Sequence, residues 1–276
     1  MNVRDHFEEL CRDGFTIIRA AHPPVVVAEW HAIAQQLAVD DEAKRTVGNF
    51  IETHTALALR TIANPHLLDM AEMTMGPFVQ LDGLTLVSWP PARESAEEAR
   101  QAKLHWHRDP WSQVPRSGVY ERPLGINMLM YLQDLDEKNG PLRVIVGSHR
   151  AAVTIAPADR TEAHAEEHLI FARRGDVIVM HNGLVHSRSP NRSDKLRSYV
   201  SVYYNLSWLR SSSRHDGPAA KRILALAEEQ NDRRLMRLLG VDSELEARTN
   251  SGFLTPDEEC WRDWIREDRA VLRPIT

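Results

Sequence analysis

The segment LHWHRDPW, residues 104–111, places His105, His107 and Asp109 at every second position. In an extended strand, alternate side chains point to the same face, so these three side chains could converge on one point. Imidazole and carboxylate groups are common ligands of transition metals. The spacing suggests a metal site, although two such residues alone occur by chance in many proteins.

A third ligand would have to come from elsewhere in the chain. The candidate segment is 180–198, MHNGLVHSRSPNRSDKLRS, where His181 or His186 follows an expected strand and turn. Two histidines and one carboxylate form the facial triad of non-heme Fe(II) oxygenases, which leaves the opposite positions open for a cosubstrate and oxygen. Arg197 begins the next expected strand, and its planar guanidinium could bind a carboxylate in bidentate fashion. The alternative for Arg197 alone is a surface ion pair.

The elements that must position these residues can be read from periodicity. Apolar residues at helical spacing predict helices over 25–38 and 218–239. Apolar and β-branched runs bounded by turn residues predict strands at 84–89, 126–132, 142–146, 176–180 and 198–206. We therefore expect helices flanking a sheet core. The charged segment 93–103 is typical of a solvated surface helix, and the irregular segment 111–123 could be a lid or a plain surface loop.

Length and composition fit one large domain. The chain has 276 residues, of which 42% are hydrophobic and 26% charged, with a net charge of -5, which gives no reason to expect nucleic acid as a partner. Cys11 and Cys260 are too few for a disulfide scaffold and fit a reducing compartment. No segment approaches the roughly 20 apolar residues of a membrane span, and the N-terminus lacks a signal-peptide core. The cytoplasm is the default location, and the oligomeric state is unknown at this stage.

Five sequence elements occur together in a recognisable order. They are Phe7 with Asp13-Gly14-Phe15, then Trp106-His107-x-Asp109, then residues 139–149 (NGPLRVIVGSH), then Gly175-Asp176, and finally His186-x4-Asn191-x-Ser193-x3-Arg197. From residue 7 to about 205 this order resembles the phytanoyl-CoA dioxygenase family of Fe(II)/2-oxoglutarate oxygenases. Five elements in order are far more specific than any one of them.

The resemblance implies a mainly β protein with flanking helices, built on a double-stranded β-helix (a cupin-like jelly roll), with residues 1–276 as a single domain carrying helical N- and C-terminal additions. It also implies that His107, Asp109 and His186 bind Fe(II) and that Arg197 holds the C5 carboxylate of 2-oxoglutarate. The reaction implied uses O2 and 2-oxoglutarate, releases succinate and CO2, and hydroxylates a small-molecule substrate. In related halogenases a small residue replaces the carboxylate, so Asp109 disfavours halogenation; desaturation, epoxidation and ring formation stay open.

Some residues depart from the family pattern or have uncertain roles. Arg188 stands where family members often have Ser or Gly. Asn127 could line the barrel interior beside 2-oxoglutarate, or lie on a strand face turned to water. His105 and His181 could reach the site, whereas His149 fits a structural turn. A further aromatic and basic set could recognise a polar or anionic substrate: Trp111, Arg116, Tyr120, Arg122, Trp208, Arg210 and Arg214.

Two other functions remain open from the sequence. One is a Zn²⁺ hydrolase at a site of two histidines and one aspartate, which would leave the spacing of Arg197 unexplained. The other is a non-catalytic jelly-roll binding protein, against which the complete set of ligands argues.

Overall fold

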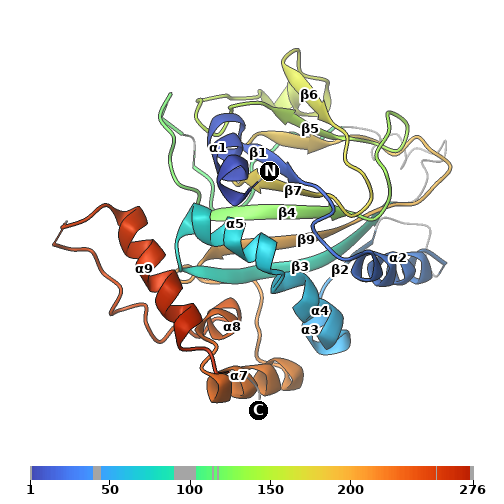
Figure 1. The fold of residues 1–276 in the computed structure, drawn as a ribbon. Helices are drawn as coiled ribbons and strands as arrows, with labels where there is room; N and C mark the ends of the chain where they lie inside the picture. The colour runs from blue at the N-terminus through green and yellow to red at the C-terminus, as the bar shows by residue number, and fades with distance from the viewer. Residues whose placement is uncertain are drawn as a thin grey trace. The chain divides into compact units, whose positions relative to one another are not determined.

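The computed structural model describes residues 2–39, 45–89, 104–113, 115, 116, 118–252 and 254–273 (Figure 1). The expected helix at 93–103 lies outside these residues. The chain divides into two compact units. The first unit comprises Met1–Gly48 and Thr85–Ser201, and the second comprises Asn49–Leu84 and Val202–Thr276.

The first unit begins with a well-capped helix. Helix α1 (Val3–Asp13) starts at a capping box, in which the side chains of Asn2 and Asp5 each accept the other's backbone N–H at 3.0 Å. It ends at Gly14, whose φ of 87° lets the chain turn directly into β1 (Phe15–Ile18). Helix α2 (Pro24–Val39) confirms the helix expected at 25–38, and β2 (Arg45–Val47) follows.

A six-stranded sheet has the order β1-β7-β4-β9-β3-β2 (Figure 1). Its remaining strands are β3 (Val79–Trp89), β4 (Gly125–Tyr131), β7 (Val177–His181) and β9 (Arg197–Leu206). Strand β7 pairs antiparallel with β1 on one side and β4 on the other, with Val179 opposite Thr16 and Met128. Strands β3 and β9 each pass from one unit into the other.

A three-stranded sheet in the first unit has the order β6-β5-β8. It consists of β5 (Leu142–Ile145), β6 (Glu167–Ile170) and β8 (His186–Arg188), and the 3-10 helix η1 (Pro157–Thr161) precedes β6. Both pairings are antiparallel, and Val144 lies opposite His186. One apolar core joins this sheet to the larger one, with members from β4 and β7 on one side and from β5 and β6 on the other: Leu129, Tyr131, Ile178, Met180, Leu142, Val144 and Ile170. Because β8 pairs with β5, His186 is carried by the sheet that this core joins to the larger one.

Six of the helices that the structure describes belong to the second unit. They are α3 (Phe50–Thr53), α4 (Thr55–Ile62), α5 (Pro65–Met75), α7 (Pro218–Gln230), α8 (Arg233–Leu238) and α9 (Asp257–Ala270). Asn64 caps α5 by accepting from the backbone N–H groups of His66 and Leu67, and Pro65 occupies its first turn. The single helix expected over 218–239 is divided into α7 and α8, because Asn231 adopts a left-handed φ of 56°.

All five expected strands are present and overlap β3, β4, β5, β7 and β9. The expectation of a mainly β protein is wrong, because helix accounts for 35% and strand for 21% of the residues that the structure describes. The described part of segment 111–123 has neither helix nor strand. Both cysteines are free thiols. Within the described residues, no helix combines the length and apolar character needed to cross a bilayer.

Candidate metal centre

Backbone pairing brings the two histidines together. His107 and His186 form an isolated antiparallel bridge, in which His107 N donates to His186 O at 3.0 Å and His186 N donates to His107 O at 2.9 Å. Asp109 N donates to Asn182 O at 3.0 Å, which anchors the carboxylate beside the turn that precedes β8. His107 is therefore placed by a single bridge rather than by the extended strand expected from its alternation.

The side chains of His107, Asp109 and His186 form a group whose potential ligand atoms all lie within 4.8 Å of one another. Asp109 Oδ1 is 3.9 Å from His107 Nε2 and 3.7 Å from His186 Nε2. The other ring nitrogens contact backbone carbonyls, His107 Nδ1 at 2.8 Å from His105 O and His186 Nδ1 at 3.0 Å from Leu184 O. If each Nδ1 carries the proton that this contact requires, both Nε2 lone pairs are directed to the common point.

Charge and exposure also suit a cation. Burial, followed by the proximity of His186, lowers the pKa of His107 to about 4, so this imidazole is neutral near pH 7. The side chains of Asp109 and His186 are 9% and 7% exposed, whereas that of His107 is 40% exposed. The group is therefore closed on the side of Asp109 and His186 and open on the side of His107.

Asn127, on β4, contacts the carboxylate of Asp109. Its Nδ2 donates to Asp109 Oδ2 at 2.9 Å, and its Oδ1 accepts from Ser201 Oγ at 2.8 Å. One carboxylate oxygen is thus held by Asn127, while the other, Oδ1, faces the two imidazoles. The sequence suggested that Asn127 could line the interior, but it contained no signal for this contact or for Ser201.

Arg197, the first residue of β9, is 2% exposed. Its Nη1 donates to Gly140 O and Ser189 O, each at 2.7 Å. Its Nε is buried without a hydrogen-bond partner, and the described residues include no carboxylate in an ion pair with it. Burial lowers the pKa of Arg197. One edge of the guanidinium is therefore fixed by carbonyls, and the edge formed by Nε and Nη2 can accept a carboxylate.

Gly140 makes room for this arginine. Its φ is 91°, and a Cβ at this position would clash with Arg197 Nη1 and with the carbonyls of Ser189 and Pro190. Glycine at this position of the 139–149 element is thus required by the close approach of Arg197 to the backbone.

Arg197 and a second arginine, Arg188, pack against the indole of Trp89. Arg188 Cζ lies 4.2 Å and Arg197 Cζ 5.6 Å from the ring centroid of Trp89. Tyr199 interacts electrostatically with both arginines and with Asp109, and burial raises the pKa of its phenol. This set of residues lies on β3, β8 and β9 within the first unit.

Other histidines named from the sequence are placed differently. His105 is exposed, and its ring lies 5.1 Å from that of His107. His181 is buried with both ring nitrogens engaged, Nε2 by Glu121 O and Nδ1 by the N–H of Gly183, so it is not part of the metal-binding group. His149 packs 4.9 Å from the His181 ring and contacts Cys11 O through Nε2.

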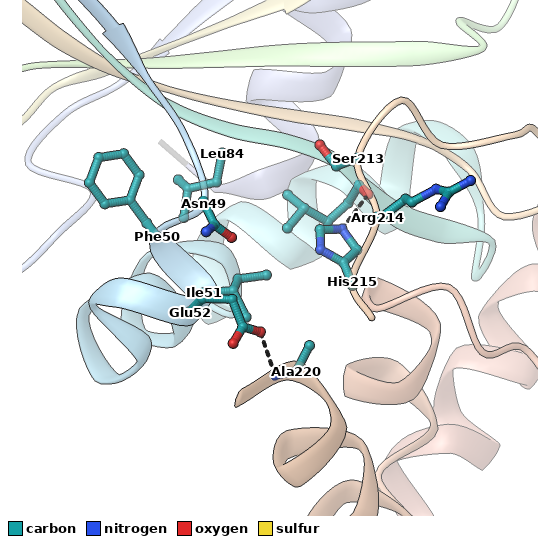
Figure 2. A pocket seen from close by; sticks show the side chains of 10 residues that line it. Asn49, Phe50, Ile51, Glu52, Leu84, Ser213, Arg214, His215 and Ala220 are labelled. Carbon is teal, nitrogen blue, oxygen red and sulfur yellow. Dashed lines mark hydrogen bonds between the residues drawn. The ribbon is translucent and has the colours of Figure 1, made fainter. Parts of the chain in front are cut away.

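The proposed substrate-recognition residues are divided between the two units. Trp111 and Arg116 are exposed, while burial raises the pKa of Tyr120. Trp208, Arg210 and Arg214 belong to the second unit. Arg214 lines a cavity of about 220 Å³ in that unit, in which Glu52 accepts hydrogen bonds from the first N–H groups of α7 (Figure 2). That cavity contains none of the metal-binding residues.

Comparison with known families identifies the chain. Residues 10–199 match the family model described as Phytanoyl-CoA dioxygenase (PhyH). The chain belongs to the phytanoyl-CoA dioxygenase family. The resemblance seen in the sequence motifs is thereby confirmed.

The matches to similar curated proteins cover only part of each protein. The chain is 25% identical over 175 residues to L-proline trans-4-hydroxylase of Streptomyces griseoviridis, a match of 53% of this chain and 62% of that protein. It is 25% identical over 195 residues to ectoine dioxygenase of Nocardia farcinica, covering 63% of each. The chain thus spans less than two thirds of the length of these relatives.

Solved structures share the fold. HygX from Streptomyces hygroscopicus, solved with nickel and 2-oxoglutarate, superposes with a TM-score of 0.61 at 15% identity, covering 75% of this chain and 88% of that one. The 2-oxoglutarate-dependent epimerase SnoN from nogalamycin biosynthesis gives 0.57 at 18% identity, covering 74% and 81%. Both belong to the Fe/2-oxoglutarate oxygenases, whose fold is a jelly roll.

Proposed function

We propose that this protein is an Fe(II)- and 2-oxoglutarate-dependent oxygenase that hydroxylates a small molecule and releases succinate and CO2. The observation that carries the proposal is the group of His107, Asp109 and His186, in which both Nε2 atoms lie within 4 Å of Asp109 Oδ1 in a member of this family. Fe(II) is favoured over Zn²⁺ because Arg197 supplies a separate carboxylate site, for which a hydrolase has no use.

The donor set fits Fe(II). Neutral imidazoles and one carboxylate are the ligands of the facial triad, and they leave part of the metal's coordination sphere open. When bound, Fe(II) supplies the centre at which O2 is reduced while 2-oxoglutarate is converted to succinate and CO2. Asn127 holds Asp109 Oδ2, which leaves Oδ1 for the metal. Because Asp109 provides a carboxylate, we expect hydroxylation rather than chlorination.

Arg197 positions the cosubstrate in this proposal. Its Nε–Nη2 edge takes the C5 carboxylate of 2-oxoglutarate, and the carbonyls of Gly140 and Ser189 hold the guanidinium so that little entropy is lost on binding. Asn127 is proposed to lie beside 2-oxoglutarate as well as against Asp109. The reason is that Asp109 and 2-oxoglutarate would bind the same metal.

The wider assignment has separate support. The names of the relatives, which include a proline hydroxylase, an ectoine dioxygenase and a probable hypophosphite dioxygenase, favour a small-molecule substrate and O2 over nucleic acid or a membrane. The core shared by the six- and three-stranded sheets supports a double-stranded β-helix. A single oxygenase domain over residues 1–276 and a cytoplasmic location stay predictions, the latter supported by two free thiols.

The test combines metal analysis with succinate release. With Fe(II), the wild-type protein should form succinate only when both 2-oxoglutarate and O2 are present. His107→Ala and His186→Ala should lose bound iron and turnover, because two ligands bind iron far more weakly than three. His105→Ala is the matched control, since His105 neighbours the group without belonging to it. Full iron occupancy and turnover in either ligand variant would disprove the triad.

A further inference from the structure

Arg188 is a second positively charged residue beside the metal-binding group. It lies two residues after His186 on β8, so both side chains point to the same face of the strand. Its guanidinium carbon is 4.2 Å from the centroid of Trp89, the ring that Arg197 also approaches. Burial lowers the pKa of Arg188, as does the charge of Arg197.

Arg188 has no anionic partner in the described part of the chain. Its Nε is buried without a hydrogen bond, and its terminal nitrogens form no ion pair or side-chain hydrogen bond with any residue that the structure describes. Because only Nε is both buried and unpartnered, the two terminal nitrogens remain accessible to solvent or ligand. Stacking on Trp89 fixes the guanidinium plane but does not neutralise its charge.

A count of the charges at the site shows that Arg188 has no negative counterpart. With the metal and cosubstrate bound, the charges of Fe(II) and Arg197 would be balanced by those of Asp109 and the two carboxylates of 2-oxoglutarate. Arg188 adds a positive charge that none of these groups balances. The buried guanidinium of Arg197 and the partly buried one of Arg188 approach the same indole and repel each other, and a further anion would relieve that repulsion.

We propose that Arg188 binds an acidic group of the primary substrate, a carboxylate or a similar oxyanion. The inference rests on the proposed function. It assigns Arg188 to the substrate rather than to 2-oxoglutarate, since the Nε–Nη2 edge of Arg197 already suits the distal carboxylate in bidentate fashion. The Cα atoms of residues two apart on a strand are separated by roughly 7 Å, so the acidic group lies several bonds from the carbon presented to the metal.

Binding measurements test this assignment without turnover. Wild type, Arg188→Gln, Arg188→Lys and Arg192→Gln would be loaded with redox-inert Ni(II) and 2-oxoglutarate and titrated by calorimetry. The ligands are small monocarboxylic and amino acids, each paired with its primary amide. Arg192 is the matched control, because it is an exposed arginine four residues further along the same segment.

At least one acid should bind wild type and Arg192→Gln more tightly than its amide does. Arg188→Gln should weaken the binding of that acid by about tenfold or more and leave the binding of its amide unchanged. Arg188→Lys should retain part of the affinity for the acid, because it keeps the charge without the planar fork. The affinity of each variant for 2-oxoglutarate, measured separately, should stay near the wild-type value.

Two outcomes would overturn the proposal. If no acid binds wild type better than its amide, the site does not select an acidic substrate. If Arg188→Gln weakens the binding of 2-oxoglutarate as strongly as the binding of the acid, Arg188 is a second residue that holds the cosubstrate. Failure of the proposed function would appear differently, as a wild-type protein that neither binds 2-oxoglutarate nor forms succinate from it.

Discussion

At the scale of single residues, the candidate site is defined by which atom of each side chain is already occupied. Backbone carbonyls contact Nδ1 of both histidines, Asn127 holds Oδ2 of Asp109, and two carbonyls hold Nη1 of Arg197. Each side chain therefore presents its remaining atom to a ligand. Residue types in the sequence indicated the metal ligands and the arginine, but the occupied atoms depend on neighbours that only the fold brings together.

Asn127 provides a test of this arrangement. Asn127→Ala removes the donor to Asp109 Oδ2, so the carboxylate can rotate and metal affinity should fall by roughly 10- to 100-fold. The affinity for Ni(II) or Fe(II) is measured by titration without 2-oxoglutarate. Ser201→Ala, which removes only the hydrogen bond to Asn127 Oδ1, should cause a smaller loss. A normal metal affinity together with weaker 2-oxoglutarate binding would instead assign Asn127 to the cosubstrate alone.

At the scale of elements, strands were easier to predict than helices. The five expected strands carry apolar runs bounded by turn residues, whereas β8 has only three residues, His186–Arg188, and no apolar run. Helices α1, α5 and α9 begin at polar signals: the Asn2 capping box, Asn64 before Pro65, and Pro256 before an acidic first turn. Apolar periodicity does not detect such local polar signals, so it predicts less helix than the structure contains.

Helices α8 and α9 of the second unit are joined by a buried ion-pair cluster. Asp268 on α9 has a fully buried carboxylate that accepts from Arg237 of α8 at 3.0 Å and from both terminal nitrogens of Arg248. Arg233 lies 3.8 Å from the same carboxylate. Burial by itself would raise the pKa of Asp268, but the hydrogen bonds and charges of Arg248 and Arg237 outweigh it and lower the pKa.

Asp268→Asn should therefore destabilise the protein by about 3–5 kcal/mol near pH 7, because it leaves buried arginines without their anion. A group with a lowered pKa in the folded state stabilises fully above its unfolded pKa, about 4 for aspartate, and loses this stabilisation as the pH falls. The difference between wild type and variant in free energy of unfolding, from urea titrations, should narrow below that pH.

The control for this prediction lies on the same helix. Asp263 forms an exposed pair with Arg266, so Asp263→Asn should change the free energy of unfolding by less than about 1 kcal/mol. An equal loss in both variants would contradict the buried cluster as the source of stability, as would a difference that does not change with pH.

At the scale of the whole molecule, every residue assigned to the metal and the cosubstrate belongs to the first unit. That unit is assembled from two separate stretches of chain, and the site draws on β4, β8, β9 and the bridge at His107. Local patterns predicted the individual strands, but the pairing of distant strands depends on the packing of a shared core. The order of the sequence motifs predicts this pairing only through the family resemblance, because members of a family share one fold.

Hydrogen exchange can test whether ligand binding acts on the first unit alone. A ligand that binds only the folded state stabilises it by about 2.7 kcal/mol at a concentration 100 times its Kd. Ni(II) with 2-oxoglutarate should therefore slow amide exchange in β4, β7 and β8, whose strands hold or adjoin His186 and Asn127. Exchange in α9, held by Asp268, should change little. His107→Ala should abolish the protection in the strands, and equal protection of α9 in wild type would contradict a site confined to the first unit.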